Sequence, residues 1–219
     1  MMTISELLDL SKTIAAPLFA GKTYPWEALE GITDYILALG PTLPAEKFDH
    51  PAEDVWIAKG VKVFQTAYIG GPCIIDEGAE IRQCAFIRGS AIVGKNCVVG
   101  NSTELKNVVL FDNVQVPHYN YVGDSILGYK AHMGAGSITS NVKSDKKLVV
   151  IHNGGEELPT GRKKVGAVLG DNVEVGCNSV LNPGTVIGRG SRVYPTSCVR
   201  GVIPENSIWK TGGKVVPQT

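Results

Sequence analysis

The sequence is poor in aromatic residues and carries no net charge. Only 7% of its 219 residues are Phe, Trp or Tyr, and 21 Lys and Arg residues are matched by 21 Asp and Glu. A core with so few rings must be packed from small and β-branched side chains. A neutral chain also lacks the excess of basic residues that is typical of nucleic-acid-binding domains. We therefore expect no nucleic-acid partner.

Long apolar runs and paired cysteines are missing as well. No stretch approaches the roughly 18 apolar residues of a membrane helix, and the start MMTISELLDLSK has no basic or apolar region of a signal peptide. The five cysteines form no C-x-x-C pair and have no metal-site spacing; they are Cys73, Cys84, Cys97, Cys177 and Cys198. We expect a cytoplasmic protein without a membrane partner, whose cysteines are reduced and mostly buried.

Residues 1–54 differ from the rest of the chain in charge. They carry three basic and nine acidic side chains, hence −6, which leaves +6 for residues 55–219. Thr3-Ile4-Ser5-Glu6 has the pattern of a helix capping box, which predicts a helix that ends before Pro17. A second helix should run from Pro25 to Gly40. It would bury Trp26, Leu29, Ile32, Ile36 and Leu39.

Residues 41–54 are rich in Pro and acidic residues, and we interpret them as a linker. The repeat that follows would have an open edge on its first coil, which invites pairing with another strand. We expect the N-terminal helices to cover that edge.

From residue 55 onward, apolar residues recur every six positions. The first run is Ile57, Val63, Ile69, Ile75, Ile81, Ile87, Val93, Val99, Leu105 and Phe111, and the second is Leu169, Val175, Leu181, Ile187, Val193 and Val199. Small or β-branched residues stand two positions before each of these, so Cys73 and Cys97 should face inward. Such hexapeptide periodicity predicts a mainly β protein with a parallel β-helix. We assign it to residues 55–208 and treat residues 209–219 as a C-terminal tail.

Two breaks interrupt the repeat. The apolar phase changes between Phe111 and Leu127, which predicts a slip within residues 115–125. Residues 141–164 then form an inserted loop with six basic and three acidic side chains. Breaks in a solenoid are frequent places for functional residues. Arg88 and Lys106, which are 18 residues or one coil apart, should stack and mark an anion site.

Four segments around these breaks resemble a known family. Residues 100–106, 116–124 and 133–141 are similar to the acetyltransferase domain of the bifunctional UDP-N-acetylglucosamine pyrophosphorylase/glucosamine-1-phosphate acetyltransferase. Residues 160–167 resemble its archaeal and thermophile sugar-1-phosphate branch. The resemblance covers residues 80–200 and implies a left-handed β-helix and a homotrimer with active sites between neighbouring coils. In that assembly the inserted loop could reach across to the next subunit. The nucleotidyltransferase domain has no counterpart, so we expect no pyrophosphorylase activity.

The resemblance also implies residue roles. His118 would be the general base, which takes a proton from a sugar amine as the amine attacks acetyl-CoA; imidazole is suited to this near neutral pH. The substrate residues would be Arg88 and Lys106 at the sugar phosphate, with Tyr121, His132, Asn141 and Lys147. The acetyl-CoA residues would be Ala135, Cys177 and Pro195. The expected function is acetyl-CoA-dependent N-acetylation of an amino-sugar phosphate, with glucosamine 1-phosphate foremost, in UDP-N-acetylglucosamine biosynthesis and without a metal.

Some positions depart from the family pattern, and two other functions remain open. His132 stands where the family has Asn, and Cys177 stands where it has Ser. Either Lys146 or Lys147 could be the lysine that the family places at the substrate site. A zinc-dependent γ-class carbonic anhydrase binds its metal with three His ligands, two of them close together in sequence. The four histidines of this chain include no such close pair; they are His50, His118, His132 and His152. A non-catalytic regulatory or scaffolding trimer that binds sugar nucleotides or sugar phosphates is the other alternative.

Overall fold

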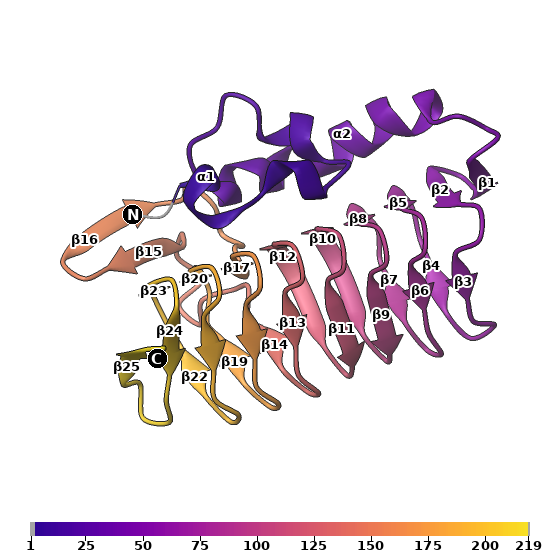
Figure 1. Ribbon diagram of the computed structural model, residues 1–219. Coiled ribbons are helices and arrows are strands. Elements are labelled where there is room, and N and C mark those ends of the chain that lie inside the picture. The colour runs from indigo at the N-terminus through magenta and orange to yellow at the C-terminus, as the bar shows by residue number, and fades with distance from the viewer. Residues whose placement is uncertain (1–2, 219) are drawn as a thin grey trace.

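The computed structural model describes residues 3–218, which form a parallel β-helix with a helical segment along one side (Figure 1). The expected fold class is confirmed. Each coil places one short strand on each of three faces, and equivalent strands of successive coils pair in parallel. The hexapeptide periodicity therefore arises because each face uses about six residues.

The first face carries strands that are apolar on both sides. It consists of β2 (Val55–Ala58), β5 (Cys73–Ile75), β8 (Ala91–Val93), the second halves of β10 (Glu104–Leu110) and β12 (Tyr121–Leu127), β17 (Ala167–Leu169), β20 (Thr185–Ile187) and β23 (Val202–Ile203). From β5 to β20 its outward side chains are buried as fully as its inward ones, as Ile74, Ile92 and Ile126 illustrate. A strand that is apolar on both sides needs a cover on its outer side.

The second and third faces complete each coil. The second face contains β3 (Lys62–Val63), β6 (Glu80–Ile81), β9 (Val98–Asn101), β11 (Gln115–His118), β13 (His132–Met133), β18 (Glu174–Val175), β21 (Arg192–Val193) and β24 (Ser207–Trp209). The third face contains β4 (Tyr68–Ile69), β7 (Phe86–Ile87), the first halves of β10 and β12, β14 (Ile138–Thr139), β19 (Val180–Leu181) and β22 (Cys198–Val199).

The N-terminal segment lies along the first face rather than over the first coil (Figure 1). Its helices are α1 (Ile4–Leu7), η1 (Leu10–Lys12), η2 (Ala16–Phe19), η3 (Pro25–Glu30), α2 (Ile32–Leu39) and η4 (Gly40–Thr42). The expectation that these helices cover the open edge is wrong, because the outward apolar side chains of the first face require the cover. The edge itself is paired by β1 (Phe48–Ala52), which runs antiparallel to β2 within the expected linker.

Both expected N-terminal helices are shorter than predicted. The capping box forms, with Thr3 N–H donating to Glu6 Oε2 at 2.6 Å, but α1 lasts one turn. It ends because the next backbone N–H, at Asp9, donates to Asp171 of the β-helix at 2.8 Å. The second helix begins as the 3-10 turn η3 and becomes α-helical only at Ile32. Its predicted apolar residues are buried except for Leu39, which is half-buried.

The phase change consists of two short corners, and only the second of them lies within the predicted residues 115–125. Ile87 pairs with Leu105, 18 residues later, but Val93 pairs with Leu110, only 17 later. The coil is therefore one residue shorter between the two halves of β10, where Asn107 forms the corner. The next coil is one residue shorter within β12, where Asp124 forms the corner. Both residues have positive φ, which Asn and Asp tolerate better than most residues.

The insertion 141–164 follows at the same corner of the next coil. It contains an antiparallel hairpin, β15 (Val150–Asn153) with β16 (Glu156–Pro159), and is not a simple loop. Val149 and Ile151 anchor it because both are buried. Three successive coils thus change length at one corner, between the third and first faces. At the C-terminal end, β25 (Val215–Pro217) pairs antiparallel with β24 within the expected tail.

The cysteines are free, but the expectation that most are buried is wrong. Cys73 and Cys97 face the interior as predicted, and burial raises the pKa of the Cys73 thiol to about 12. Cys84, Cys177 and Cys198 are exposed because they lie at outward or corner positions of their coils. Among the described residues no helix has the length and apolar character of a membrane span.

Candidate functional site

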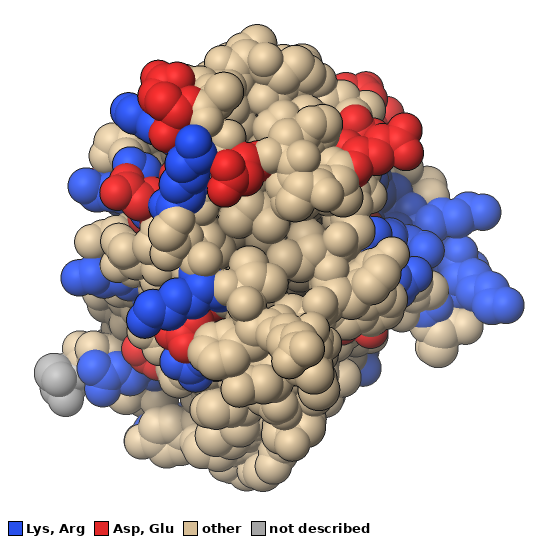
Figure 2. Space-filling model, turned by 90° about the vertical axis from the view of Figure 1, so that its right-hand side faces the viewer, with Lys and Arg blue, Asp and Glu red and all other residues tan. Residues whose placement is uncertain are grey.

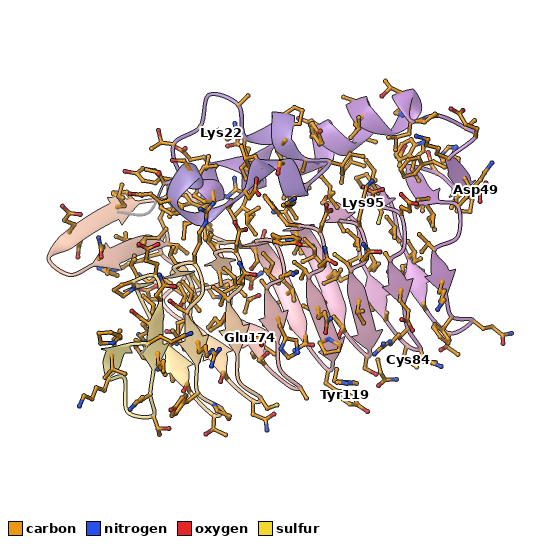
Figure 3. The ribbon with its side chains drawn as sticks, viewed as in Figure 1. Lys22, Asp49, Cys84, Lys95, Tyr119 and Glu174 are labelled. Atoms are coloured by element: carbon orange, nitrogen blue, oxygen red, sulfur yellow. The ribbon has the colours of Figure 1, made fainter. Side chains whose placement is uncertain are left out.

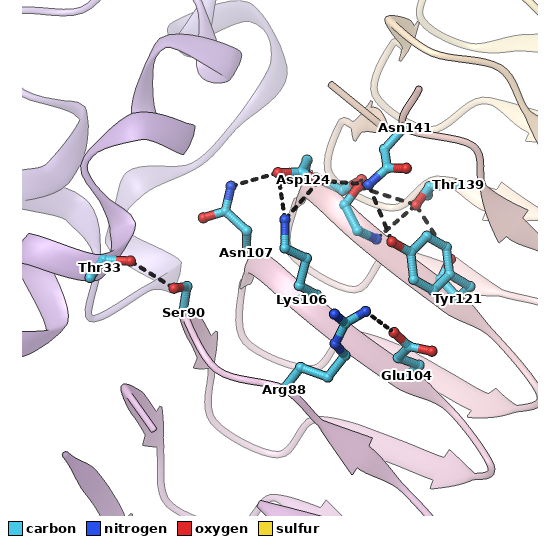
Figure 4. A network of polar contacts seen from close by, with 12 residues as sticks. Thr33, Arg88, Ser90, Glu104, Lys106, Asn107, Tyr121, Asp124, Thr139 and Asn141 are labelled. Atoms are coloured by element: carbon cyan, nitrogen blue, oxygen red, sulfur yellow. Dashed lines mark hydrogen bonds and ion pairs between the residues drawn. The ribbon is translucent and has the colours of Figure 1, made fainter. Parts of the chain in front are cut away.

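The corner between the third and first faces is organised around Asp124. Its side chain is only 3% exposed. The Asn107 side chain donates to Oδ1 at 2.9 Å, the Asn141 side chain donates to Oδ2 at 2.6 Å, and Lys106 Nζ lies 3.5 Å from both oxygens (Figure 4). Asn141 also donates to the Tyr121 hydroxyl at 3.2 Å. We call Lys106, Asn107, Tyr121, Asp124 and Asn141 the Asp124 cluster.

The two short corners create this cluster. Asn107 and Asp124 are 17 residues apart, which is one shortened coil, so they occupy equivalent positions on successive coils. Their positive φ values turn each chain early and bring the Asn107 amide onto the Asp124 carboxylate. The sequence did not point to Asp124 and Asn107 as functional residues, because coils of a constant 18 residues do not place them in contact. The 17-residue spacing of these two turn-forming residues was the available signal.

Arg88 and Lys106 stack on neighbouring coils as predicted. Ile87 and Leu105 pair directly, and the Arg88 N–H donates to the Leu105 carbonyl at 2.9 Å. Both cations also face carboxylates, because Arg88 Nη1 lies 2.8 Å from Glu104 and Lys106 Nζ lies 3.5 Å from Asp124. A phosphate at this place would therefore meet two cations that acidic neighbours already hold in position.

Tyr121 connects the cluster to the third face. Its ring is half-buried, and burial raises the pKa of its phenol. The hydroxyl therefore stays protonated at neutral pH and can donate a hydrogen bond to a ligand while it accepts one from Asn141. Its N-terminal neighbour Asn120 is buried and donates to the carbonyl of Gly134 at 2.9 Å. This buried bond fixes the start of β12.

The corner between the second and third faces carries a different arrangement. Successive coils place Asn101, His118, Ala135, Cys177 and Pro195 at equivalent positions, which we call the His118 column. Its ladder includes the N–H of Tyr119 to the Asn101 carbonyl at 2.8 Å and the N–H of Gly136 to the His118 carbonyl at 3.0 Å. In the same way the backbone N–H of Asn178 donates to the Ala135 carbonyl and that of Thr196 to the Cys177 carbonyl, both at 2.8 Å.

His118 and all three residues predicted to contact acetyl-CoA thus lie in one column. This corner is exposed and lies on the side away from the helical segment, where Figure 3 labels Tyr119 and Cys84. The His118 N–H is held by the Asn120 side chain at 3.1 Å. Within residues 3–218 no protein group hydrogen-bonds its imidazole, so both ring nitrogens are available to a ligand.

Two predicted substrate residues lie elsewhere. His132 stands on the second face, where its Nδ1 is 2.7 Å from Glu174 Oε2. Lys147 is exposed in the insertion, and its backbone N–H donates to Asp145 at 3.1 Å. In the described structure neither side chain hydrogen-bonds to the Asp124 cluster. The structure therefore brings together Arg88, Lys106, Tyr121 and Asn141, but not His132 or Lys147.

The histidines also lie apart from one another. His50 stacks on Trp56 with ring centroids 5.0 Å apart, and His152 faces Glu157 at 3.3 Å on the hairpin. His118 and His132 belong to β11 and β13. Across residues 3–218, no three His, Cys, Asp or Glu side chains lie close enough to hold a metal ion.

A cavity beside the Asp124 cluster was not foreseen from the sequence. It measures about 670 Å³ and lies between the N-terminal segment, the corner and the end of the insertion. Its lining residues are Glu27, Leu29, Glu30, Lys106, Asn107, Asp124 and residues 160–164. No sequence spacing connects these three segments, so only their packing reveals the cavity.

Comparison with known proteins gives the family. The family model of the GMPPB C-terminal domain matches residues 69–203, more than half of the chain. The bifunctional protein GlmU of Methanococcus vannielii is 34% identical over 189 residues, 85% of this chain and 45% of that protein. The bifunctional sugar-1-phosphate nucleotidylyltransferase/acetyltransferase of Sulfurisphaera tokodaii is 34% identical over 160 residues, 65% of this chain and 40% of its own length.

The chain therefore spans less than half the length of these curated relatives. The matched region is the β-helix that carries both the Asp124 cluster and the His118 column. The chain belongs to the family of the GMPPB C-terminal domain, and its β-helix is related to part of the bifunctional GlmU proteins.

Proposed function

We propose that the protein is an acetyl-CoA-dependent N-acetyltransferase that acts on an amino-sugar phosphate, with glucosamine 1-phosphate as the first candidate. The observation that carries this proposal is the position of His118. Its free imidazole lies in one column with Ala135, Cys177 and Pro195, and it precedes Tyr121, at the start of the third face, by three residues. A base would thus stand between a coenzyme site and a sugar site.

The reaction follows from these positions. Arg88 and Lys106 bind the phosphate, because guanidinium and ammonium groups together offer several charge-assisted hydrogen bonds. Tyr121 and Asn141 hydrogen-bond the sugar and direct its amine toward His118. As the amine nitrogen attacks the thioester carbonyl, a C–N bond forms and His118 accepts the amine proton. The C–S bond then breaks, and His118 returns the proton to the departing thiolate.

Acetyl-CoA would lie along the rest of the His118 column. Ala135, Cys177 and Pro195 present small side chains on successive coils at an exposed corner. Backbone N–H groups at such a corner suit the carbonyl oxygen, on which negative charge develops during attack. Cys177 in place of the family's Ser contributes a weaker donor, so the backbone carries more of this stabilisation.

A homotrimer is part of this proposal. The third face exposes two aromatic rings, with Tyr68 61% and Phe86 42% exposed, and their centroids are 5.4 Å apart. Adjacent exposed rings on a flat face are typical of a protein interface. Association through this face would surround the sugar site with a second subunit. Sedimentation at micromolar concentration tests this, and a monomer would contradict it.

The function is tested by thiol release from acetyl-CoA with a panel of amino-sugar phosphates. His118→Ala should lower kcat by about 10²–10⁴-fold, the usual contribution of a general base. His152→Ala is the matched control, because it removes an exposed histidine that pairs with Glu157 on the hairpin. Equal activity of His118→Ala and wild type would exclude His118 as the base.

A non-catalytic binding protein is the second candidate. It is favoured by His132 and Cys177, which depart from the family pattern at a predicted substrate position and a predicted coenzyme position. Such a protein would bind a sugar phosphate without releasing thiol from acetyl-CoA on any amine. Calorimetric binding together with the thiol assay separates the two candidates.

A further inference from the structure

The cavity beside the Asp124 cluster brings together three segments that are distant in sequence. One wall is η3 of the N-terminal segment, with Glu27 and Glu30, and the opposite wall is residues 160–164 of the insertion. Lys106, Asn107 and Asp124 of the β-helix form the floor. A volume of about 670 Å³ is within the range of sites for small ligands and far exceeds the needs of a single phosphate.

The charges of the cavity favour an anion at the wall formed by the insertion. Four cations line it against three acids, so its net charge is +1. Lys106 faces Asp124 at 3.5 Å and Arg162 faces Glu30 at 3.7 Å. Lys163 and Lys164 are exposed, and within residues 3–218 neither has an ion-pair partner. They are therefore the cations available to a ligand.

The opposite wall offers hydrogen-bond acceptors. The Glu30 side chain is 89% exposed, and among residues 3–218 its one ion pair is the 3.7 Å contact with Arg162. Figure 2 shows acidic side chains at the level of the N-terminal segment above a dense group of Lys and Arg. A ligand between the walls should thus carry phosphate on one side and hydroxyl groups on the other, as a nucleotide does.

Lys106 connects this cavity to the proposed sugar site. It belongs to the floor of the cavity, and it also stacks on Arg88 at the third face. From Tyr121 to Asp124 the third face is about 10 Å long at about 3.3 Å per residue. With the amine at the His118 corner, a sugar ring spans this face and places its phosphate at Arg88 and Lys106. Whatever is bonded to that phosphate continues into the cavity.

We propose that the amino sugar is carried on a nucleoside diphosphate, whose second phosphate binds Lys163 and Lys164 and whose ribose hydroxyls face Glu30. This inference rests on the acetyl transfer of the proposed function, and it replaces glucosamine 1-phosphate with a nucleotide-linked amino sugar as the preferred substrate. A sugar monophosphate would leave the cavity and both lysines unused. Coenzyme A also contains a nucleoside diphosphate, but its proposed site is the His118 column at the opposite end of the third face.

Binding of UDP, GDP, glucosamine 1-phosphate and coenzyme A to the full-length protein tests the proposal, by calorimetry at fixed ionic strength. Lys163→Gln with Lys164→Gln should weaken the binding of at least one nucleoside diphosphate by about tenfold, or about 1.4 kcal/mol. The same double variant should leave glucosamine 1-phosphate and coenzyme A within about twofold of wild type. Lys62→Gln with Lys95→Gln is the control, because it removes the same charge from the first coils, far from the cavity.

The outcomes separate this inference from the proposed function. Equal nucleoside diphosphate affinity in wild type and the Lys163/Lys164 variant overturns the inference, as does a loss confined to coenzyme A. Acetylation of the sugar monophosphate as efficiently as of nucleotide-linked amino sugars also overturns it, yet leaves the acetyltransferase function intact. If the diphosphate binds through Lys163 and Lys164 but no amine is acetylated, the acetyltransferase function fails instead, while the nucleotide site stands.

Discussion

The two corners that border the third face are built in opposite ways. At the Asp124 corner the side chains are satisfied by one another, with a carboxylate 3% exposed and three partners around it. At the His118 corner the backbone is fixed by Asn120, but the imidazole has no partner among the described residues. The comparison teaches that one corner positions a ligand through a preorganised polar network, whereas the other leaves a reactive group free.

The largest difference should appear when the central residue of each corner is removed. Asp124→Ala leaves Lys106 without its buried partner and should cost about 3 kcal/mol of unfolding free energy. His118→Ala removes an exposed side chain and should change stability by less than about 0.5 kcal/mol, although it removes the proposed base. Urea unfolding measures both. Similar losses in the two variants would contradict the distinction between the corners.

Asp124→Asn sharpens the comparison with less damage to the fold. The amide keeps the size of the side chain but lacks the charge, so Lys106 and Asn141 lose a charged acceptor, worth about 1.5–3 kcal/mol for each such bond. We expect KM for the sugar phosphate to rise by about tenfold or more, while KM for acetyl-CoA stays within about twofold. Equal effects on both KM values would show that Asp124 acts on the whole site.

Thiol reactivity should separate the His118 column from the core. Cys73 and Cys97 are buried, and burial raises the pKa of Cys73 to about 12, so neither should react in the native protein at pH 8. Cys84, Cys177 and Cys198 are exposed and should be modified. Saturating coenzyme A should slow the labelling of Cys177 but not of Cys84. Mass spectrometry after timed labelling measures each site. If coenzyme A does not protect Cys177, acetyl-CoA does not bind along the His118 column.

The smallest effect concerns Tyr121. Burial raises the pKa of its phenol above the ordinary value of about 10. A group with a raised folded pKa stabilises the fold fully below its unfolded pKa, and this stability is lost as pH rises through the folded pKa. Wild type should therefore lose more stability than Tyr121→Phe as the pH rises above about 10. Parallel pH dependence of the two proteins would show that the phenol is not restrained.

The repeat itself was predictable, and its corners were not. Apolar residues with a period of six, such as Ile75, Ile81 and Ile87, lie inside as expected, because each strand turns one of its two sides toward the interior of the coil. The sequence pattern also indicates which face the N-terminal segment covers, since Ile74 and Ile92 make the first face apolar on both sides. The prediction missed this because it considered only the inward positions.

The candidate site divides in the same way. The resemblance named His118, Arg88, Lys106, Tyr121 and Asn141, and the structure gathers the last four on one face and its corner. It named no role for Asp124 or Asn107, because their contact requires two corners that are each one residue short. The resemblance also named Lys147 and His132, but the structure places them away from this group, in the insertion and on the second face.

The sequence by itself determined the β-helix, its interior residues and the family, because these follow from local periodicity and from motifs contiguous along the chain. Only the tertiary structure decided which face the helical segment covers, how Asp124 organises its corner, and that a charged cavity lies beside it. Those features depend on segments up to 162 residues apart, such as Asp9 and Asp171. Contacts at that separation form only when coils of unequal length have been stacked, and no local pattern records their outcome.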